Sequence, residues 1–369
     1  MADRPPMRVL MYGSEHAAPA TRVCDWAVDA GHEVVWAGYL GEISGSSRAR
    51  HVQIQSWDNP VPELAAIAAD FRPHVTHSHN FSFLTEFHHE AGLGPLILSA
   101  FGGLNGLIGS VPPKPRIDDL MATGPTVIVE SRPLFDAATK RYDGIDCELI
   151  CLGVNPVHYK PGTLAKRAAW RQALQIPVDA IVFFSARGIG DGYRQQEILR
   201  AFASALPDLP ATAGLAMIRL TRSWDRSDRV RELQQLAEEL GISERLYWIP
   251  EVRYEMMPGM YGMVDFVVNY PVADAFPSTL LEAAACGVPV VTANLRAYAG
   301  SYIEQFCELV DPDDWQALAR GLVRSAREPA ELQARRVSDG RRHVIDNFSE
   351  TVGRERTLAV YERVARAPH

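Results

Sequence analysis

The feature that most constrains the fold of this chain is a regular alternation of short apolar runs with stretches of helical spacing. Strands are predicted at 8–12, 32–38, 74–79, 95–103, 126–131 and 147–153, most of which are short apolar runs. Helical spacing is found at 20–31 and at 62–71. Strands that alternate with helices build a parallel sheet with helices on both faces. The first part of the chain is therefore predicted to be an α/β domain.

The same rhythm starts again after one interruption. Residues 155–167 contain Pro156, Pro161 and Gly162 and have no apolar periodicity, which predicts a linker between two domains. Beyond it, strands are predicted at 180–186, 214–220, 245–249, 265–270 and 288–293, with helices at 194–206 and 228–240. The pattern predicts two Rossmann-like halves, whose ligands bind at the carboxyl ends of the strands.

Composition narrows the class of protein further. The 369 residues include 37 Lys and Arg against 45 Asp and Glu, and a net charge of −8 argues against a nucleic-acid partner. Five cysteines without a C-x-x-C motif favour neither a disulfide framework nor a zinc ribbon. The chain has no apolar run of about 18 residues for a membrane span, nor a leader-like apolar stretch at its start. A cytoplasmic protein without an integral membrane segment is expected.

The segment DAFPSTLLEAAACGVPVV at 274–291 carries the most chemical information. It follows the predicted strand 265–270, and a helix is expected from Thr279 to Cys286. The preceding loop therefore opens onto a helix N-terminus, where free N–H groups and the positive dipole end suit a diphosphate. Asp274 in the loop and Glu282 in the helix could hold sugar hydroxyls on either side of such an anion.

This segment resembles the signature of glycosyltransferase family 4, a group of retaining enzymes with the GT-B fold. Other parts of the chain are similar to that family in the same order, at 150–161, 185–206, 229–252 and 348–364. The resemblance implies an α/β fold of GT-B type, with two Rossmann-like parallel-sheet domains facing a cleft. It implies an acceptor-binding domain at 1–158, a nucleotide-sugar-binding domain at 159–347, and a C-terminal helix at 348–369 that crosses back to the first domain.

The resemblance also implies roles for the matching residues of the second domain. Glu282 would accept hydrogen bonds from the ribose, and Asp274 would hold hydroxyls of the donor sugar. Arg187 would pair with the diphosphate, and Arg194 is the cation nearest to the position of a family lysine. The remaining donor-site contacts would come from Phe276, from the backbone of Ser278, Thr279 and Leu280, and from Pro250 and Glu251 near the base. Such enzymes use no metal and no cofactor besides the nucleoside-diphosphate sugar, which is a co-substrate.

Two departures from the family pattern leave alternatives open. Pro277 stands where the family usually has glycine, and Phe101-Gly102 replaces a His-Gly pair whose histidine faces the sugar. Phe101 thus implies an unusual donor sugar or altered chemistry. One alternative is a GT-B enzyme of another reaction type, such as a sugar epimerase or a pseudo-glycosyl coupling enzyme. The other is a non-catalytic nucleotide-sugar binder.

Candidate acceptor contacts lie after strands of the first domain. They are Gly13, Glu15 and His16, then His79 and Asn80, and finally Phe101 and Gly102. Because no basic amphipathic stretch suggests a lipid acceptor, a soluble small molecule or a saccharide is preferred, for example in secondary metabolism. The sequence therefore predicts a metal-independent, retaining glycosyltransferase that binds a nucleotide-sugar donor and such an acceptor.

Overall fold

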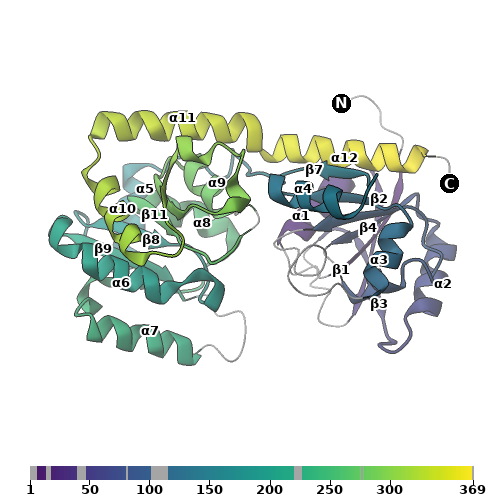
Figure 1. The fold of residues 1–369 in the computed structure, drawn as a ribbon, viewed down its shortest axis with the longest axis horizontal. Coiled ribbons are helices and arrows are strands. Elements are labelled where there is room, and N and C mark those ends of the chain that lie inside the picture. The colour runs from purple at the N-terminus through teal and green to yellow at the C-terminus, as the bar shows by residue number, and fades with distance from the viewer. Residues whose placement is uncertain are drawn as a thin grey trace. The chain divides into compact units, whose positions relative to one another are not determined.

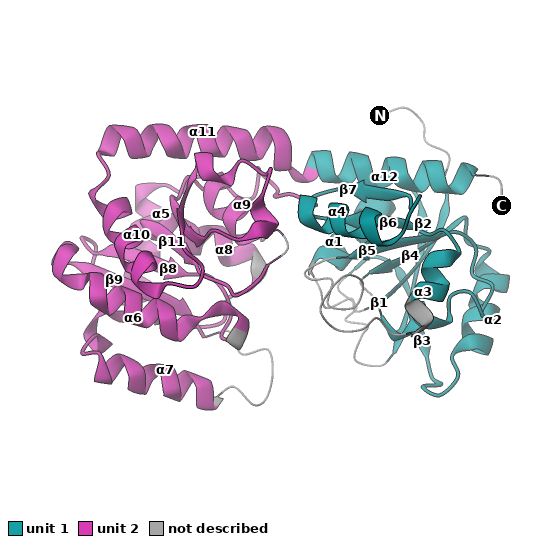
Figure 2. Ribbon diagram, viewed as in Figure 1, with its two compact units in different colours: residues 1–152, 351–369 teal, residues 153–350 magenta. Residues whose placement is uncertain are grey.

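The structure is a computed structural model that describes residues 6–13, 18–39, 47–79, 82–100, 115–219, 227–274, 276 and 278–367. The chain divides into two compact units (Figures 1 and 2). Unit 1 comprises Met1–Leu152 and Thr351–His369, and unit 2 comprises Gly153–Glu350. The chain therefore leaves unit 1, builds the whole of unit 2 and returns to unit 1 for its last helix.

Unit 1 contains a parallel sheet of seven strands in the order β3-β2-β1-β4-β5-β6-β7. The strands are β1 (Arg8–Gly13), β2 (Glu33–Tyr39), β3 (Arg50–Ile54), β4 (Val75–His79), β5 (Leu96–Ala100), β6 (Thr126–Val129) and β7 (Cys147–Leu149). Its helices are α1 (Ala18–Asp29), α2 (Val61–Phe71), the 3-10 helix η1 (Phe83–Phe87), α3 (Pro115–Ala122), α4 (Arg132–Arg141) and α12 (Glu350–Arg366).

The central strand β1 shows why this sheet is covered on both faces. Val9 and Met11 belong to one buried cluster, while Leu10 and Tyr12 belong to another. Successive side chains of a strand point to opposite faces, so an unbroken apolar run needs a core on each side. Tyr361 of α12 lies in the same cluster as Val9 and Met11, so the last helix helps to cover that face.

Unit 2 contains a second parallel sheet of six strands in the order β10-β9-β8-β11-β12-β13. The strands are β8 (Ile181–Ser185), β9 (Ala213–Ile218), β10 (Leu246–Ile249), β11 (Phe266–Asn269), β12 (Val290–Ala293) and β13 (Cys307–Val310). Its α-helices are α5 (Leu164–Ala173), α6 (Gln195–Ala205), α7 (Ser227–Glu239), α8 (Met257–Met263), α9 (Ser278–Ala285), α10 (Trp315–Arg327) and α11 (Ala330–Phe348).

The strand order of both sheets reverses beside the first strand. In unit 1, β1 lies between β2 and β4, and in unit 2, β8 lies between β9 and β11. At such a switch point the connections leave in opposite directions, and a crevice opens at the carboxyl ends of the two central strands. The topology therefore predicts that ligands bind near the residues that follow β1 and β4 in unit 1, and near those that follow β8 and β11 in unit 2. The predicted α/β class with two parallel sheets is confirmed.

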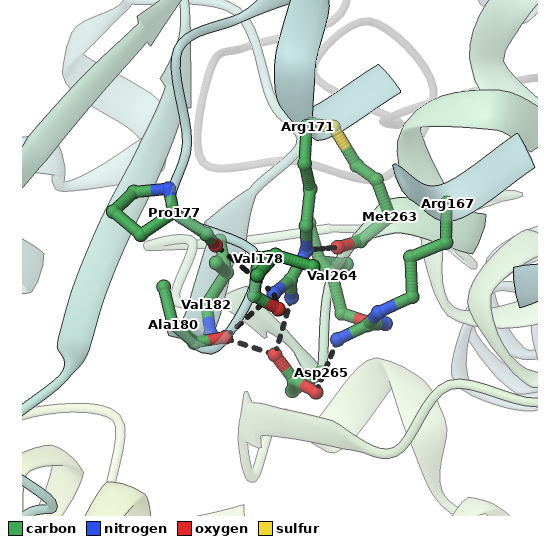
Figure 3. Close-up of polar contacts among 9 residues, drawn as sticks. All are labelled: Arg167, Arg171, Pro177, Val178, Ala180, Val182, Met263, Val264 and Asp265. Carbon is green, nitrogen blue, oxygen red and sulfur yellow. Dashed lines mark hydrogen bonds and ion pairs between the residues drawn. The ribbon is translucent and has the colours of Figure 1, made fainter. Parts of the chain in front are cut away.

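Helix α5 corrects one sequence prediction, because it begins at Leu164 inside the segment expected to be a linker. The helix is attached to the sheet through arginines rather than through an apolar stripe (Figure 3). Arg171 is almost fully buried and donates to the backbone oxygens of Met263, Val178 and Ala180, each at 2.8 Å. Its guanidinium also bonds to Asp265, which receives a second bond from Arg167 at 2.6 Å.

Among the described residues, no helix combines the length and the apolar character that crossing a membrane requires.

Candidate functional site

Arg187 follows β8 by two residues and lies at the switch point of unit 2. Its Nη2 atom donates to the hydroxyl of Tyr193 at 2.8 Å and lies 3.4 Å from Oδ2 of Asp274. Its Nη1 atom donates to Oγ1 of Thr279 at 3.4 Å. The guanidinium also lies over the Tyr193 ring, 4.3 Å from the centroid. The structure thus brings Arg187, Asp274 and Thr279 together, three residues that the sequence analysis assigned to the donor site.

The charge state of Arg187 follows from these neighbours. Burial lowers the pKa of its guanidinium, but the Asp274 carboxylate and Tyr193 more than offset that effect and raise the net pKa above its ordinary value. The side chains of Arg187 and Asp274 are only 20% and 10% exposed. A permanent cation is therefore held in a sheltered position beside a carboxylate, where an incoming anion would meet little screening by water.

The N-terminus of α9 adds backbone donors to this cation. The helix begins at Ser278, and Thr279 is buried next to Arg187. The first four N–H groups of a helix have no partner within the helix and form the positive end of its dipole. Ser278 is exposed, whereas Leu280 is buried in the core, so Leu280 has only its backbone to offer. The arrangement suits a phosphate group that contacts the helix end and Arg187 together.

Glu282 lies one turn into α9 and is buried. The hydroxyl of Tyr261, a buried residue of α8, donates to its Oε2 atom at 2.8 Å. Burial, and then the Glu282 carboxylate, raise the pKa of Tyr261 well above its ordinary value, so the phenol keeps the proton that it donates. The same two causes raise the pKa of Cys286 to about 12. Tyr261 therefore orients one carboxylate oxygen of Glu282.

The other predicted donor-site residues have different surroundings. Phe276 is buried, with its ring centroid 5.1 Å from that of Phe348 and 6.5 Å from that of Tyr298, which gives it a packing role in the loop before α9. Pro250 and Glu251 follow β10 and are exposed. Pro277 lies outside the described residues.

Arg194 makes its contacts away from the Arg187 cluster. It adopts a left-handed backbone conformation, with a φ of 49°, just before α6. Its guanidinium donates to the backbone oxygen of Pro312 and to Oδ1 of Asp313, and it lies over the ring of Tyr270 at 5.5 Å. The structure therefore ties Arg194 to the loop that precedes α10, whereas Arg187 bonds to the loop that precedes α9.

Two of the predicted acceptor residues meet at the switch point of unit 1. Gly13 ends β1, His79 ends β4, and the two residues are paired in register. Gly13 has a φ of 116°, and a Cβ atom there would lie 2.5 Å from the backbone oxygen of His79, so only glycine fits. Burial lowers the pKa of His79 to about 3, and its ring stacks on Trp36 at 5.2 Å. The remaining acceptor candidates, Glu15, His16, Asn80, Phe101 and Gly102, lie outside the described residues.

Tyr193 and Tyr261 are site residues that the sequence analysis missed. Tyr193 contacts the cation and Tyr261 contacts the buried carboxylate. A tyrosine is equally compatible with a hydrophobic core, so only its place beside a charged partner identifies it. The G-x-G-x-G spacing just before Tyr193 was the one local signal, because it indicated a loop at the carboxyl end of β8.

Comparisons with known proteins match part of the chain to one family and nearly the whole chain to one fold. Residues 166–343 match the family described as glycosyl transferases group 1. A D-inositol 3-phosphate glycosyltransferase of Saccharomonospora viridis is 27% identical over 275 residues, which cover 68% of this chain and 62% of that protein. The protein of the same name from Geodermatophilus obscurus is 31% identical over 190 residues, which cover 50% of this chain and 41% of that protein. The chain thus spans less than two thirds of the length of these relatives.

Solved structures match over nearly the whole chain at low sequence identity. A glycosyltransferase from Rickettsia africae has a TM-score of 0.81 at 15% identity, with 99% of this chain and 100% of that chain covered. The HepE protein of Anabaena, solved in complex with UDP and glucose, has a TM-score of 0.77 at 16% identity, with 97% and 100% covered. These matches concern the fold.

Proposed function

We propose that the chain is a retaining glycosyltransferase that uses a nucleoside-diphosphate sugar, a proposal supported by the match of residues 166–343 to the glycosyl transferases group 1 family. The observation that carries the proposal is the cluster of Arg187, Asp274 and Thr279 at the N-terminus of α9, at the switch point of unit 2. This cluster offers a cation, a carboxylate and backbone N–H groups within one small region.

In this proposal each residue has a separate task. Arg187 and the N-terminus of α9 bind the diphosphate and stabilise the charge that develops on it as it leaves. Asp274 binds hydroxyls of the donor sugar, and Glu282, oriented by Tyr261, binds the ribose. A charge-assisted hydrogen bond of this kind contributes about 1.5–3 kcal/mol.

The transfer itself requires no metal. The bond between the anomeric carbon and the diphosphate oxygen breaks, while the acceptor oxygen bonds to the same carbon on the same face. The acceptor proton passes to the departing phosphate oxygen. The chain's part is to hold donor and acceptor in this geometry, which replaces a bimolecular encounter by a step within one complex.

We assign the donor to unit 2 and the acceptor to unit 1, where Gly13 and His79 end the two central strands. The acceptor is a small molecule or a saccharide. A uridine nucleotide is the first donor to test, since a solved structure of similar fold was obtained with UDP and glucose.

A thermal-shift series with UDP, GDP, ADP and dTDP tests the donor site. At about 100 times its dissociation constant, a ligand that binds only the folded state stabilises it by roughly 2.7 kcal/mol. We expect one nucleotide to raise the melting temperature of the wild type and to raise that of Glu282→Ala much less. Glu331→Ala, which removes an exposed carboxylate of α11, is the matched control and should respond like the wild type.

The absence of a response to all four nucleotides would contradict the donor-site assignment. Incubation of the matching UDP-, GDP-, ADP- or dTDP-sugar with candidate acceptors, followed by NMR, then identifies the reaction. A new glycoside with the anomeric configuration of the donor supports the proposal. Consumption of the donor without any glycoside would favour an epimerase or a coupling enzyme instead, and binding without consumption would favour a nucleotide-sugar binder.

A further inference from the structure

Unit 1 carries an exposed aromatic group that the proposed function does not use. It consists of Tyr39, the last residue of β2, Trp57 in the loop between β3 and α2, and Phe83, the first residue of η1. Trp57 is 59% exposed and Phe83 is 38% exposed, whereas Tyr39 is fully buried. We call these three residues the aromatic platform. Exposed aromatic side chains that lie together mark a candidate binding surface.

The platform has a defined geometry. The Trp57 and Tyr39 rings are stacked, with centroids 3.8 Å apart and an angle of 12° between their planes. Phe83 leans on Tyr39 at 6.1 Å and meets the edge of Phe87 at 5.0 Å. Because Tyr39 covers one face of the indole and Trp57 is more than half exposed, the opposite indole face is open to a ligand.

The loop that carries Trp57 is held by hydrogen bonds. The Glu63 carboxylate, in the first turn of α2, accepts from the N–H groups of Gln55 at 2.9 Å and Ser56 at 2.7 Å. The Tyr39 hydroxyl donates to the backbone oxygen of Ser56 at 3.2 Å, and the Asn59 N–H group donates to the Ser56 side chain. The indole is therefore fixed before any ligand arrives, which lowers the entropic cost of binding.

The place of the platform in the fold connects it with the acceptor. Its three residues follow or end β2, β3 and β4, so they lie at the carboxyl edge of the sheet, the edge at which β1 and β4 end with Gly13 and His79. Ligands of parallel sheets bind at this edge.

The surroundings of the indole indicate the chemistry of the ligand. Next to it, Gln55, Asp58 and Asn59 are exposed and polar, and Asp58 carries a negative charge. A flat apolar face with a polar rim matches a pyranose ring, which has C–H groups on one face and hydroxyls around its edge. Binding to an anionic membrane surface would require basic residues around the indole, and a negatively charged residue at this position disfavours such binding.

We infer that the aromatic platform is an acceptor subsite that binds the pyranose ring of a neutral saccharide against the open face of Trp57. The inference rests on the proposed glycosyltransferase function and deepens it, because it assigns the acceptor to the saccharides. It also assigns Trp57 as a specificity-determining residue.

Fluorine NMR of protein labelled with 5-fluorotryptophan tests the inference on the full chain. The seven tryptophans give separate probes, and the signal of Trp57 is identified by its loss in Trp57→Phe. Glucose, maltose, lactose and sucrose are titrated in turn. We expect at least one of them to shift the Trp57 signal. Saturation-transfer NMR of that sugar should then show about tenfold weaker binding to Trp57→Ala, and unchanged binding to Tyr302→Ala, a control that removes a 55%-exposed aromatic ring from unit 2.

The outcomes separate this inference from the proposed function. If no sugar shifts the Trp57 signal, the inference that the aromatic platform binds a saccharide is wrong. If UDP still stabilises the protein in that case, the proposed function is unaffected. The protein is also titrated with p-nitrophenol and with phosphatidylglycerol vesicles. If only one of these shifts the Trp57 signal, the ligand of the aromatic platform is not a saccharide. Sugar binding at Trp57 without binding of any nucleotide would support the subsite and contradict the proposed function.

Discussion

Arg187 contacts Tyr193, Asp274 and Thr279, and these contacts link ligand binding to the stability of the fold. It supplies the positive charge of the candidate donor site, but it also neutralises Asp274, whose side chain is only 10% exposed. Removing one member of a sheltered ion pair leaves the other charge without compensation. A single substitution of Arg187 therefore changes the fold's stability and the site's affinity together.

A double-mutant cycle separates the two effects. We expect Arg187→Met to lower both the free energy of unfolding and the affinity for the nucleoside diphosphate, the latter by at least tenfold, since a charge-assisted bond contributes about 1.5–3 kcal/mol. Adding Asp274→Asn should restore most of the stability and none of the affinity. Urea unfolding and calorimetric titration measure the two quantities. If Arg187→Met bound the nucleotide as tightly as does Arg320→Met, an exposed control, Arg187 would have no role in the site.

At the scale of elements, the sequence predicts all the central strands of both sheets and two of the four edge strands, β7 and β10. The strands β1, β8 and β11 were found because both of their faces are buried and their sequences are mostly apolar, and the buried strand β4 was found although most of its residues are polar. Two of the four edge strands, β3 and β13, were missed, since polar residues at exposed or half-buried positions interrupt the apolar run. Helix α5 was missed because arginines, not an apolar stripe, fasten it.

The residues of the candidate site also fall into two groups, those that the sequence predicts and those that it does not. Arg187, Asp274 and Glu282 were predicted because they are charged residues in segments that resemble the family signature, close to the ends of strands or helices. Tyr193 and Tyr261 were not, because their roles depend on partners that lie elsewhere in the folded chain. For Tyr261 that partner, Glu282, is 21 residues away.

The attachment of α5 gives a prediction at this scale. Arg171 is 1% exposed and donates to four backbone oxygens as well as to Asp265 (Figure 3). We expect Arg171→Met to lower the unfolding free energy of unit 2 by about 3–5 kcal/mol, because buried acceptors and a carboxylate lose their partner.

Arg167→Met, at a side chain that is 26% exposed, is the control and should cost clearly less. Arg171→Lys keeps the charge but cannot reproduce the fork of hydrogen bonds, and it should resemble Arg171→Met. Denaturant unfolding measures all three variants. Equal losses for Arg167→Met and Arg171→Met would show that burial of the guanidinium is not what makes Arg171 important.

At the scale of the whole molecule, buried histidines distinguish the two units. His77, His79 and His88 all lie in unit 1, and burial lowers the pKa of each. For His88 the pKa falls to about 4. Its Nε2 lies 2.9 Å from the Gly94 carbonyl, which can only accept, and its Nδ1 lies 2.8 Å from the Tyr12 hydroxyl. The neutral ring therefore donates at Nε2 and accepts at Nδ1, and a second proton would remove that acceptor.

The two units should consequently respond differently to acid. A histidine of the unfolded chain binds a proton below a pH of about 6.5, whereas in the folded chain His79 and His88 have pKa values of about 3 and about 4, and the pKa of His77 is also lowered. Between those values the unfolded state binds more protons, so the stability of unit 1 falls as the pH decreases, by up to about 1.4 kcal/mol per pH unit for each histidine. We expect the fluorine signals of Trp26 and Trp36 in unit 1 to report unfolding at a lower urea concentration at pH 5 than at pH 7.5. For Trp170 and Trp248 in unit 2, the urea concentration at which unfolding occurs should change less between these two pH values.

His88→Gln, which can still donate and accept a hydrogen bond, should reduce the pH dependence of the stability of unit 1. An equal loss of stability in both units on acidification would mean that carboxylates, rather than the buried histidines, control the response to acid.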